Sequence, residues 1–272
     1  MQILTPTFDL DAYYAALSAA SERVLMLDYD GTLAPFKIRP DQAVPYPGVV
    51  QLLDAVMAQA DTHVVIVSGR RASEVAALLS LQRSPEIWGA HGWERMSAGG
   101  VVHVQEAAEE TRKALSSAEA SAEGIRRAGG RIECKPASVA LHWRGLPVIK
   151  IARLREQVKS AWQPFAADGL LELIAFDGGL ELRARGTNKE HAVRTVLAES
   201  GAACVAAYLG DDITDEDAFR AIKGRGLAVL VRSEPRETLA DLWLKPPREL
   251  IAFLQRWRHP EHKPARGRVE AG

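Results

Sequence analysis

The segment of residues 23–32 places two carboxylates directly after an apolar run, and this arrangement restricts the fold more than any other stretch. Residues 24–27 are all apolar, which predicts a short strand buried on both faces, as in a parallel sheet. Asp28 and Asp30 follow at its carboxyl end, where open α/β sheets bind ligands. An ionised carboxylate removed from water must be paired or must bind a cation, so the pair predicts a metal site. The alternative is an ordinary Asp-Gly turn after a strand.

The same order of apolar strand and amphipathic helix repeats along the chain. Apolar runs predict further buried strands at residues 62–67, 203–209 and 227–231. Alternation of this kind favours an α/β fold with a doubly wound, Rossmann-like parallel sheet. The apolar residues at helical spacing predict helices at residues 8–20, 49–60, 72–79, 188–200 and 238–257, the last interrupted at Pro246 and Pro247.

The middle of the chain departs from this pattern. A helix is predicted over residues 105–128, two strands over 131–144, a second helix over 149–161, and a hairpin over 171–185. We therefore expect an inserted α+β module at residues 105–184, within a core formed by residues 1–104 and 185–258. Residues 259–272 mix proline, glycine and charged residues, which predicts a disordered tail.

The composition is that of an ordinary globular protein and argues against several classes of partner. The chain has 272 residues, 25% of them charged, and a formal net charge of −1, so nothing indicates nucleic acid or an anionic membrane. Two cysteines, Cys134 and Cys204, do not make a disulfide framework and fit a reducing compartment. We find no pattern of a signal peptide or a membrane span, so we expect a cytoplasmic protein, with a monomer as the simplest state.

Polar and charged side chains follow three of the predicted strands, and a lysine begins a predicted helix. The carboxyl ends of parallel strands lie on one edge of a sheet, so Asp28, Asp30, Ser68 and Asp211 should converge, with Lys189 near them. Carboxylate oxygens with few nitrogen or sulfur ligands favour a hard cation, first of all Mg²⁺. A helix start after a serine, together with a lysine, favours an anion. The combination indicates phosphoryl transfer.

Several segments resemble one known group of enzymes. The motif DYDGTL at residues 28–33 resembles the first motif of the haloacid dehalogenase superfamily. The segments GAHGWE at 89–94, ECKPASVALHWR at 133–144 and LELR at 180–183 are similar to those of trehalose-6-phosphate phosphatases, the second matching E-x-K-x-x-S-x-x-x-H-x-R. The resemblance covers roughly residues 20–255 and implies a haloacid dehalogenase core with an inserted α+β cap.

The resemblance also implies roles for the converging residues. Asp28 would attack phosphorus to form an aspartyl-phosphate. Asp30 would protonate the leaving alcohol and then activate water. Mg²⁺ would be held by Asp28, Asp30 and Asp211, and the phosphate oxygens by Ser68 and Lys189. The implied reaction is hydrolysis of trehalose 6-phosphate, a small-molecule sugar phosphate, in trehalose biosynthesis.

Further acids follow Asp211 in the chain. By resemblance Asp215 supports the metal site through water or a hydrogen bond. For Asp212 a supporting role and the capping of the next helix stay open. Glu216 is read as a favourable charge in the first turn of a helix. Glu190 stands where similar phosphatases have glycine, and its effect stays open.

The remaining predicted contacts are with the substrate. Thr32 can donate a hydrogen bond to an anion, and Arg70 either reaches the substrate or forms a surface ion pair. In the inserted module a polar series on alternating positions would bind sugar hydroxyls, although a solvated strand face and ordinary packed histidines remain alternatives. The other predicted substrate contacts are His91, Gly92, Glu133, Lys135, Ser138, His142, Arg144 and Glu181.

Three other functions stay open from the sequence. The chain could be a phosphatase for another sugar or glycoside phosphate, such as sucrose phosphate or glucosylglycerate phosphate. It could be a catalytically silent sugar-phosphate sensor or a regulatory partner of a synthase, although Asp28, Asp30 and Lys189 are all present. It could also be a phosphotransferase that uses an alcohol instead of water.

Overall fold

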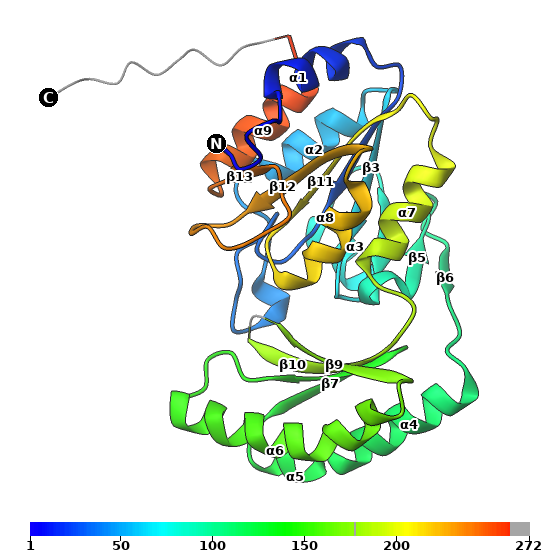
Figure 1. The fold of residues 1–272 in the computed structure, drawn as a ribbon, viewed down its shortest axis with the longest axis vertical. Helices are drawn as coiled ribbons and strands as arrows, with labels where there is room; N and C mark the ends of the chain where they lie inside the picture. Colours follow the sequence, from blue (N-terminus) through cyan, green and yellow to red (C-terminus); the bar gives the residue numbers. More distant parts are fainter. Residues whose placement is uncertain (177, 262–272) are drawn as a thin grey trace, which may run out of the picture.

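A mainly parallel sheet forms the centre of the molecule (Figure 1). The computed structural model describes residues 1–176 and 178–261, and within them this sheet has nine strands. The pairings from β13 through β12, β11, β2 and β3 to β4 are parallel, and the edges are antiparallel. The strands in spatial order are β1 (Gln2–Ile3), β13 (Leu242–Leu244), β12 (Gly226–Val231), β11 (Val205–Gly210), β2 (Arg23–Leu27), β3 (Thr62–Val67), β4 (Glu86–Gly89), β5 (Glu94–Met96) and β6 (Val102–Val104).

Helices cover both faces of this sheet, as the alternation of apolar residues predicts. Leu25 and Leu27 of β2 pack into one apolar cluster, whereas Val24 and Met26 pack into the cluster on the other face. This burial on both sides confirms the expected doubly wound α/β class. The first face is covered by α1 (Leu10–Ala19), α2 (Val49–Met57), α3 (Ala72–Leu79) and α9 (Arg248–Arg258), and the second by α7 (Lys189–Glu199) and α8 (Glu216–Ile222).

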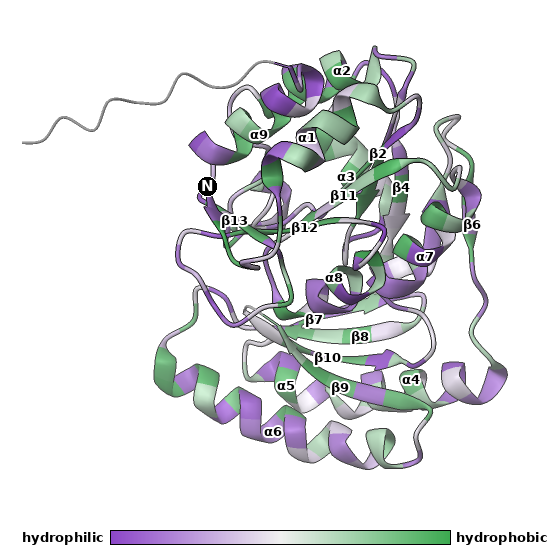
Figure 2. Cartoon of the chain, turned by 45° about the horizontal axis from the view of Figure 1, so that its top comes forward, coloured by the Kyte–Doolittle hydropathy of each residue, from purple (hydrophilic) through white to green (hydrophobic). Residues whose placement is uncertain are grey.

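A smaller antiparallel sheet lies beside the carboxyl-end edge of the large one (Figure 1). One of its faces is covered by helices, and Trp162 lies fully buried in the cluster between them. Figure 2 shows that α6 alternates hydrophilic and hydrophobic segments, as a helix with one buried face should. The strands in spatial order are β7 (Arg131–Lys135), β8 (Ser138–His142), β10 (Gly179–Ala184) and β9 (Leu171–Phe176), and the helices are α4 (Glu109–Ser121), α5 (Glu123–Arg127) and α6 (Val148–Ala167).

Two predicted helices differ from the structure. The helix expected over residues 238–257 is wrong in its first part, because Leu242–Leu244 forms a buried strand parallel to β12. Pro246 and Pro247 then separate this strand from α9, since proline cannot continue a helix across them. The helix expected over residues 105–128 starts at Glu109 and is divided at Ala122.

Residues 262–272, which make up most of the tail predicted at 259–272, lie outside the part of the chain that the structure describes. Among the residues that the structure places, none of the helices combines the length and the apolar character that a membrane crossing requires.

Candidate active site

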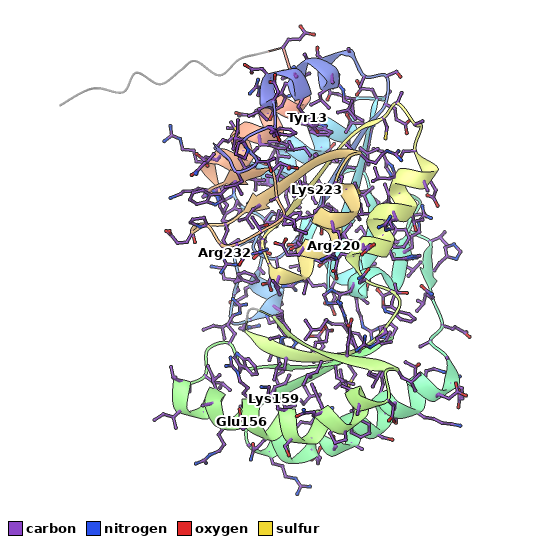
Figure 3. All side chains as sticks on the ribbon, in the orientation of Figure 1. Tyr13, Glu156, Lys159, Arg220, Lys223 and Arg232 are labelled. Atoms are coloured by element: carbon purple, nitrogen blue, oxygen red, sulfur yellow. The ribbon has the colours of Figure 1, made fainter. Side chains whose placement is uncertain are left out.

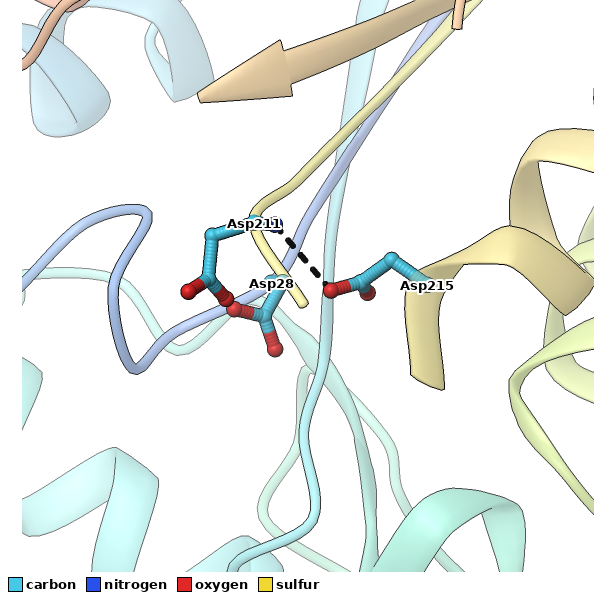
Figure 4. Close-up of side chains that lie close together, drawn as sticks. All are labelled: Asp28, Asp211 and Asp215. Atoms are coloured by element: carbon cyan, nitrogen blue, oxygen red, sulfur yellow. Dashed lines mark hydrogen bonds between the residues drawn. The ribbon is translucent and has the colours of Figure 1, made fainter. Parts of the chain in front are cut away.

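Three buried carboxylates meet at the carboxyl ends of two adjacent parallel strands. Asp28 directly follows β2, Asp211 directly follows β11, and Asp215 closes the 3-10 turn Ile213–Asp215. One carboxylate oxygen from each of these three residues lies within 4.8 Å of those from the other two (Figure 4). The strand topology therefore brings together acids that are more than 180 residues apart in the chain (211 − 28 = 183).

The backbone around the cluster holds Asp211 close to the first strand. The Asp28 N–H donates to the carbonyl of Leu209 at 2.8 Å, which extends the pairing of β2 with β11. Gly31 has a φ of +86°, and a Cβ atom there would lie only 2.1 Å from Oδ2 of Asp211. A glycine is thus required at residue 31, both for its backbone conformation and for the space that the Asp211 carboxylate fills.

Lys189 is the cation that the described residues place within the cluster. It is the first residue of α7, and its Nζ lies 2.7 Å from Oδ1 of Asp28 and 2.7 Å from Oδ1 of Asp215. The Tyr208 hydroxyl also donates to Oδ1 of Asp215, at 2.6 Å. One ammonium group therefore faces three buried carboxylates.

The pKa values follow from this crowding. Burial and the nearby charge of Asp215 raise the pKa of Asp28 to about 7, even though Lys189 lowers it. Burial and the charge of Asp28 likewise raise the pKa of Asp211 well above its usual range. The pKa of Lys189 is raised too, because Asp215 and Asp28 outweigh the effect of its burial. Full ionisation of the cluster thus calls for more positive charge than Lys189 supplies.

The cluster fits a hard divalent cation. Oδ2 of Asp28 is buried and has no hydrogen-bond partner among the described residues, so a potential ligand atom is left without a protein donor. The potential ligand atoms that Asp28, Asp211 and Asp215 bring together are carboxylate oxygens, which Mg²⁺ and similar ions prefer. A bound cation would therefore satisfy both the orphaned oxygen and the excess of negative charge.

Asp30 points in another direction. Its two carboxylate oxygens accept from Arg70, at 2.6 Å from Nε and 2.7 Å from Nη2, and Arg70 also donates to the Pro40 carbonyl at 3.0 Å. The backbone N–H of Arg70 donates to Oγ of the buried Ser68 at 3.2 Å. The Asp30 carboxylate is thus held by a two-pronged ion pair beside the acid cluster, and not within it.

A cavity of about 850 Å³ opens above the cluster, between the two sheets. Apolar groups that the sequence analysis did not single out form part of its wall, among them Phe36, Ile38 and Phe176. They lie in loops or at a strand end, where no helical or strand periodicity marks them as part of a site. The Phe36 ring packs against the Arg144 guanidinium, with 4.1 Å between the guanidinium carbon and the ring centroid. The predicted residues that line the cavity are Asp28, Asp30, Ser68, Arg70, His91, Glu133, Lys135, His142, Arg144, Glu181, Lys189, Asp211 and Asp212.

Four predicted residues, Thr32, Gly92, Ser138 and Asp215, do not line the cavity. Thr32 is fully buried, with its hydroxyl unpartnered within the described residues, and Gly92 packs against the chain at Asn188. Ser138 and Asp215 lie outside the cavity wall and form hydrogen bonds with residues that line it. Asp212 lines the cavity and also caps the turn at 213–215 by accepting from the Ile213 N–H at 2.7 Å.

Glu181 joins the small sheet to the large one. Its Oε1 accepts from Ser138 Oγ at 2.6 Å and lies 3.5 Å from Lys135 Nζ, whereas its Oε2 lies 3.0 Å from Nε2 of His91. His91 comes from the glycine-rich segment after β4 and has a left-handed φ of 57°. Burial acts against ionisation of Glu181, but Lys135 and His91 outweigh it, so the pKa of Glu181 lies well below its usual value.

Glu133 forms a second charged group on the same face of the small sheet. In the register Glu133 pairs with Ala140, which pairs with Glu181, so the two glutamates lie on one line across three strands. Oε2 of Glu133 lies 2.6 Å from Nε2 of His142. Burial would raise the pKa of Glu133, but His142 and Lys135 lower it to about 2.

This lowered pKa leads to a testable pH dependence. The ionised Glu133 stabilises the fold above its unfolded pKa, about 4.3, and this contribution is lost as pH falls toward the folded value. We expect the free energy of unfolding to fall more in the wild type than in Glu133→Gln between about pH 5 and about pH 3. Urea unfolding at both pH values measures the difference. An equal loss in the two proteins would mean that Glu133 is not stabilised as a carboxylate.

Comparisons with known proteins agree with this architecture. The sequence matches the trehalose-phosphatase family over residues 26–245. It is 32% identical over 244 residues to a trehalose-phosphate phosphatase of Mycobacterium ulcerans, covering 85% of this chain and 60% of that protein. It is also 29% identical over 228 residues to the trehalose-6-phosphate phosphatase of Escherichia coli, covering 82% and 79%. The chain thus spans only about 60% of the length of the mycobacterial relative.

Solved structures show the same fold. The C-terminal domain of a Candida albicans trehalose-6-phosphate phosphatase superposes with a TM-score of 0.78 at 20% identity, over 95% of this chain and 99% of that one. A trehalose-6-phosphate phosphatase of Aspergillus fumigatus gives a TM-score of 0.65 at 25% identity, over 94% and 99%.

Proposed function

Because the chain belongs to the trehalose-phosphatase family, we propose that it hydrolyses trehalose 6-phosphate to trehalose and phosphate through an aspartyl-phosphate. We take it as a cytoplasmic monomer that acts on this small molecule with Mg²⁺ as cofactor. One observation carries the proposal: a buried acid cluster that includes a lysine lies at one end of a cavity whose lining also contains charged side chains of the small sheet.

Asp28 and Asp211 are the proposed protein ligands of the cation. Asp215 supports them by accepting from the backbone N–H groups of Asp211 and Asp212, at 3.1 and 3.0 Å. When bound, Mg²⁺ would offset the negative charges of Asp28 and of the substrate phosphate. Because the Asp30 carboxylate pairs with Arg70 outside the acid cluster, we do not assign it to the cation. We assign it to proton transfer, once a bound substrate has separated it from Arg70 and it has taken up a proton.

The proposed reaction has two steps. In the first, an oxygen of Asp28 forms a bond to phosphorus while the bond from phosphorus to the sugar oxygen breaks, and Asp30 gives its proton to that oxygen. In the second, Asp30 takes a proton from water, which attacks phosphorus and releases Asp28 and inorganic phosphate. The Ser68 hydroxyl and Lys189 would hold phosphate oxygens, since both line the cavity beside Asp28.

The small sheet and its helices are proposed to act as a cap, at residues 105–184. Its open face supplies carboxylates, a lysine and a histidine, which match the donors and acceptors of sugar hydroxyls. A cavity of about 850 Å³ is large enough for a ligand of disaccharide size. Covering the acid cluster in this way would also keep bulk water from the phosphate.

The cap assignment predicts a specific effect of Glu133→Ala. Loss of a hydrogen bond between a charged group and a sugar hydroxyl should lower kcat/KM for trehalose 6-phosphate about 10- to 100-fold. The value for p-nitrophenyl phosphate, which has no sugar, should fall far less. Steady-state kinetics with both substrates give the two ratios.

The matched control is Glu156→Ala. Glu156 is an exposed glutamate on α6, on the far side of the small sheet from the cavity (Figure 3). This variant should keep the wild-type preference. Equal losses on both substrates in Glu133→Ala would contradict the assignment of Glu133 to the sugar.

A further inference from the structure

The peptide group between Asp211 and Asp212 is hydrogen-bonded at both of its ends. Its N–H, on Asp212, donates to Oδ2 of Asp215 at 3.0 Å. Its carbonyl, on Asp211, accepts from Nε of Arg236 and from Nη1 of Arg232, each at 3.4 Å. The shortest of these contacts to the loop joins Nη2 of Arg236 to the next carbonyl, on Asp212, at 2.7 Å. The loop that carries Asp211 is thus held from two opposite sides.

Arg236 is itself held in place. Its Nη1 forms an ion pair with Oε1 of Glu216, at the start of α8. Glu216 also accepts from the Thr238 hydroxyl and from the Leu239 N–H, both at 2.8 Å. The side chains of Arg236 and Glu216 are only 19% and 14% exposed. Glu216 therefore ties the segment after β12 to α8, and is more than a favourable charge in the first helical turn.

We propose that Arg236 is a positioning residue for the cation ligand Asp211. The inference rests on the cation site of the proposed function. Asp211 fills the space beside Gly31, where a Cβ atom would clash with it, so a small rotation of its backbone would displace the carboxylate. Arg236 fixes that backbone through two carbonyl groups. Groups that orient metal ligands from outside the coordination shell typically change metal affinity about 10- to 100-fold when they are removed.

Charge and positioning predict opposite results for Arg236→Gln. Loss of a positive charge near a cation site strengthens the attraction for the cation, so electrostatics alone predicts tighter binding. Loss of positioning predicts weaker binding. The double variant Arg236→Gln with Glu216→Gln removes the ion pair without changing the net charge, and it isolates the effect of positioning.

The test measures binding of Mn²⁺, which suits the same carboxylate ligands as Mg²⁺, by electron paramagnetic resonance of the unbound ion. We expect about 10-fold weaker binding in Arg236→Gln and in the double variant. The control is Arg220→Gln, which loses the same charge from an exposed residue of α8 (Figure 3). It should bind Mn²⁺ as the wild type does. A loss of thermal stability without a change in Mn²⁺ affinity would show a merely structural role and would overturn the proposal.

The cation site and the role of Arg236 can be contradicted separately. A wild-type chain that binds no Mn²⁺ would overturn the cation site, and this inference with it. A wild-type chain that binds Mn²⁺, with variants that bind it equally or more tightly, would overturn the role of Arg236 alone. Arg236→Lys keeps the charge but loses the fork of donors, and it covers the case in which Arg236→Gln does not fold. It too should bind Mn²⁺ more weakly than the wild type, and unchanged binding would contradict the proposal.

Discussion

Asp28→Asn is expected to lower the rate of phosphate release from trehalose 6-phosphate by about 10⁴-fold or more. An amide cannot form the acyl-phosphate, and loss of a nucleophile removes most of an enzyme's chemical rate. The fold should persist, because asparagine has the same shape and burial already disfavours the charged form of Asp28. Steady-state kinetics measure the rate, and thermal unfolding measures the stability.

Two further measurements test the assignment of Asp28 as the nucleophile. The wild type, mixed rapidly with substrate and quenched in acid, should carry phosphate on the peptide that contains Asp28, and the variant should carry none. Asp168→Asn, an identical change at an exposed residue that ends α6, should leave the rate unchanged. Activity near the wild-type level in Asp28→Asn would contradict the assignment of the nucleophile.

Lys189→Met is expected to lower the free energy of unfolding by about 3–5 kcal/mol at neutral pH and to abolish activity. The lysine is buried and lies 2.7 Å from both Asp28 and Asp215, so its removal leaves two buried carboxylates without their cation. Urea unfolding followed by circular dichroism measures the loss.

The loss of stability in Lys189→Met should depend on pH. Without the lysine the pKa of Asp28, already about 7 through burial, should rise further. An acid whose pKa is raised in the folded state destabilises the fold as pH rises from its unfolded value, about 3.9, toward its folded value. The wild type shares this effect up to the pKa of its own Asp28, about 7, so the extra loss in the variant should be smallest below about pH 7 and should grow as pH rises above it. Lys189→Arg, which keeps the charge, should be more stable than Lys189→Met at neutral pH, and equal stability would contradict the role of the ion pairs.

The sequence was sufficient to predict the centre of the fold and the convergence of its acids. Residues 24–27 form a strand buried on both faces, and Asp28 therefore had to lie at the edge of the sheet where Asp211 also lies. Such a prediction is reliable for a parallel sheet, because the convergence of the strand ends depends only on the order of the strands and not on the conformations of side chains.

Other features depend on contacts that no local pattern encodes. The carboxylate of Asp30 is directed by Arg70, forty residues away in the chain, and its rotamer could not be read from the motif. Arg236 reaches the Asp212 carbonyl across twenty-four residues, from a segment that the sequence predicts to lie just before a helix. The buried strand Leu242–Leu244 lies within the helix that the sequence predicts over residues 238–257, because a run of three residues is too short to reveal its period.

The central claim, a cation-dependent phosphatase with a cap selective for a disaccharide, is tested most directly by phosphate release from four substrates. These are trehalose 6-phosphate, sucrose 6-phosphate, glucose 6-phosphate and glucosylglycerate phosphate, each measured with Mg²⁺ and after chelation. We predict a kcat/KM for trehalose 6-phosphate at least about tenfold above the others, lost on chelation and restored by Mg²⁺. A preference for another substrate would contradict the cap assignment, and no phosphate release from any of the four would contradict the proposed function.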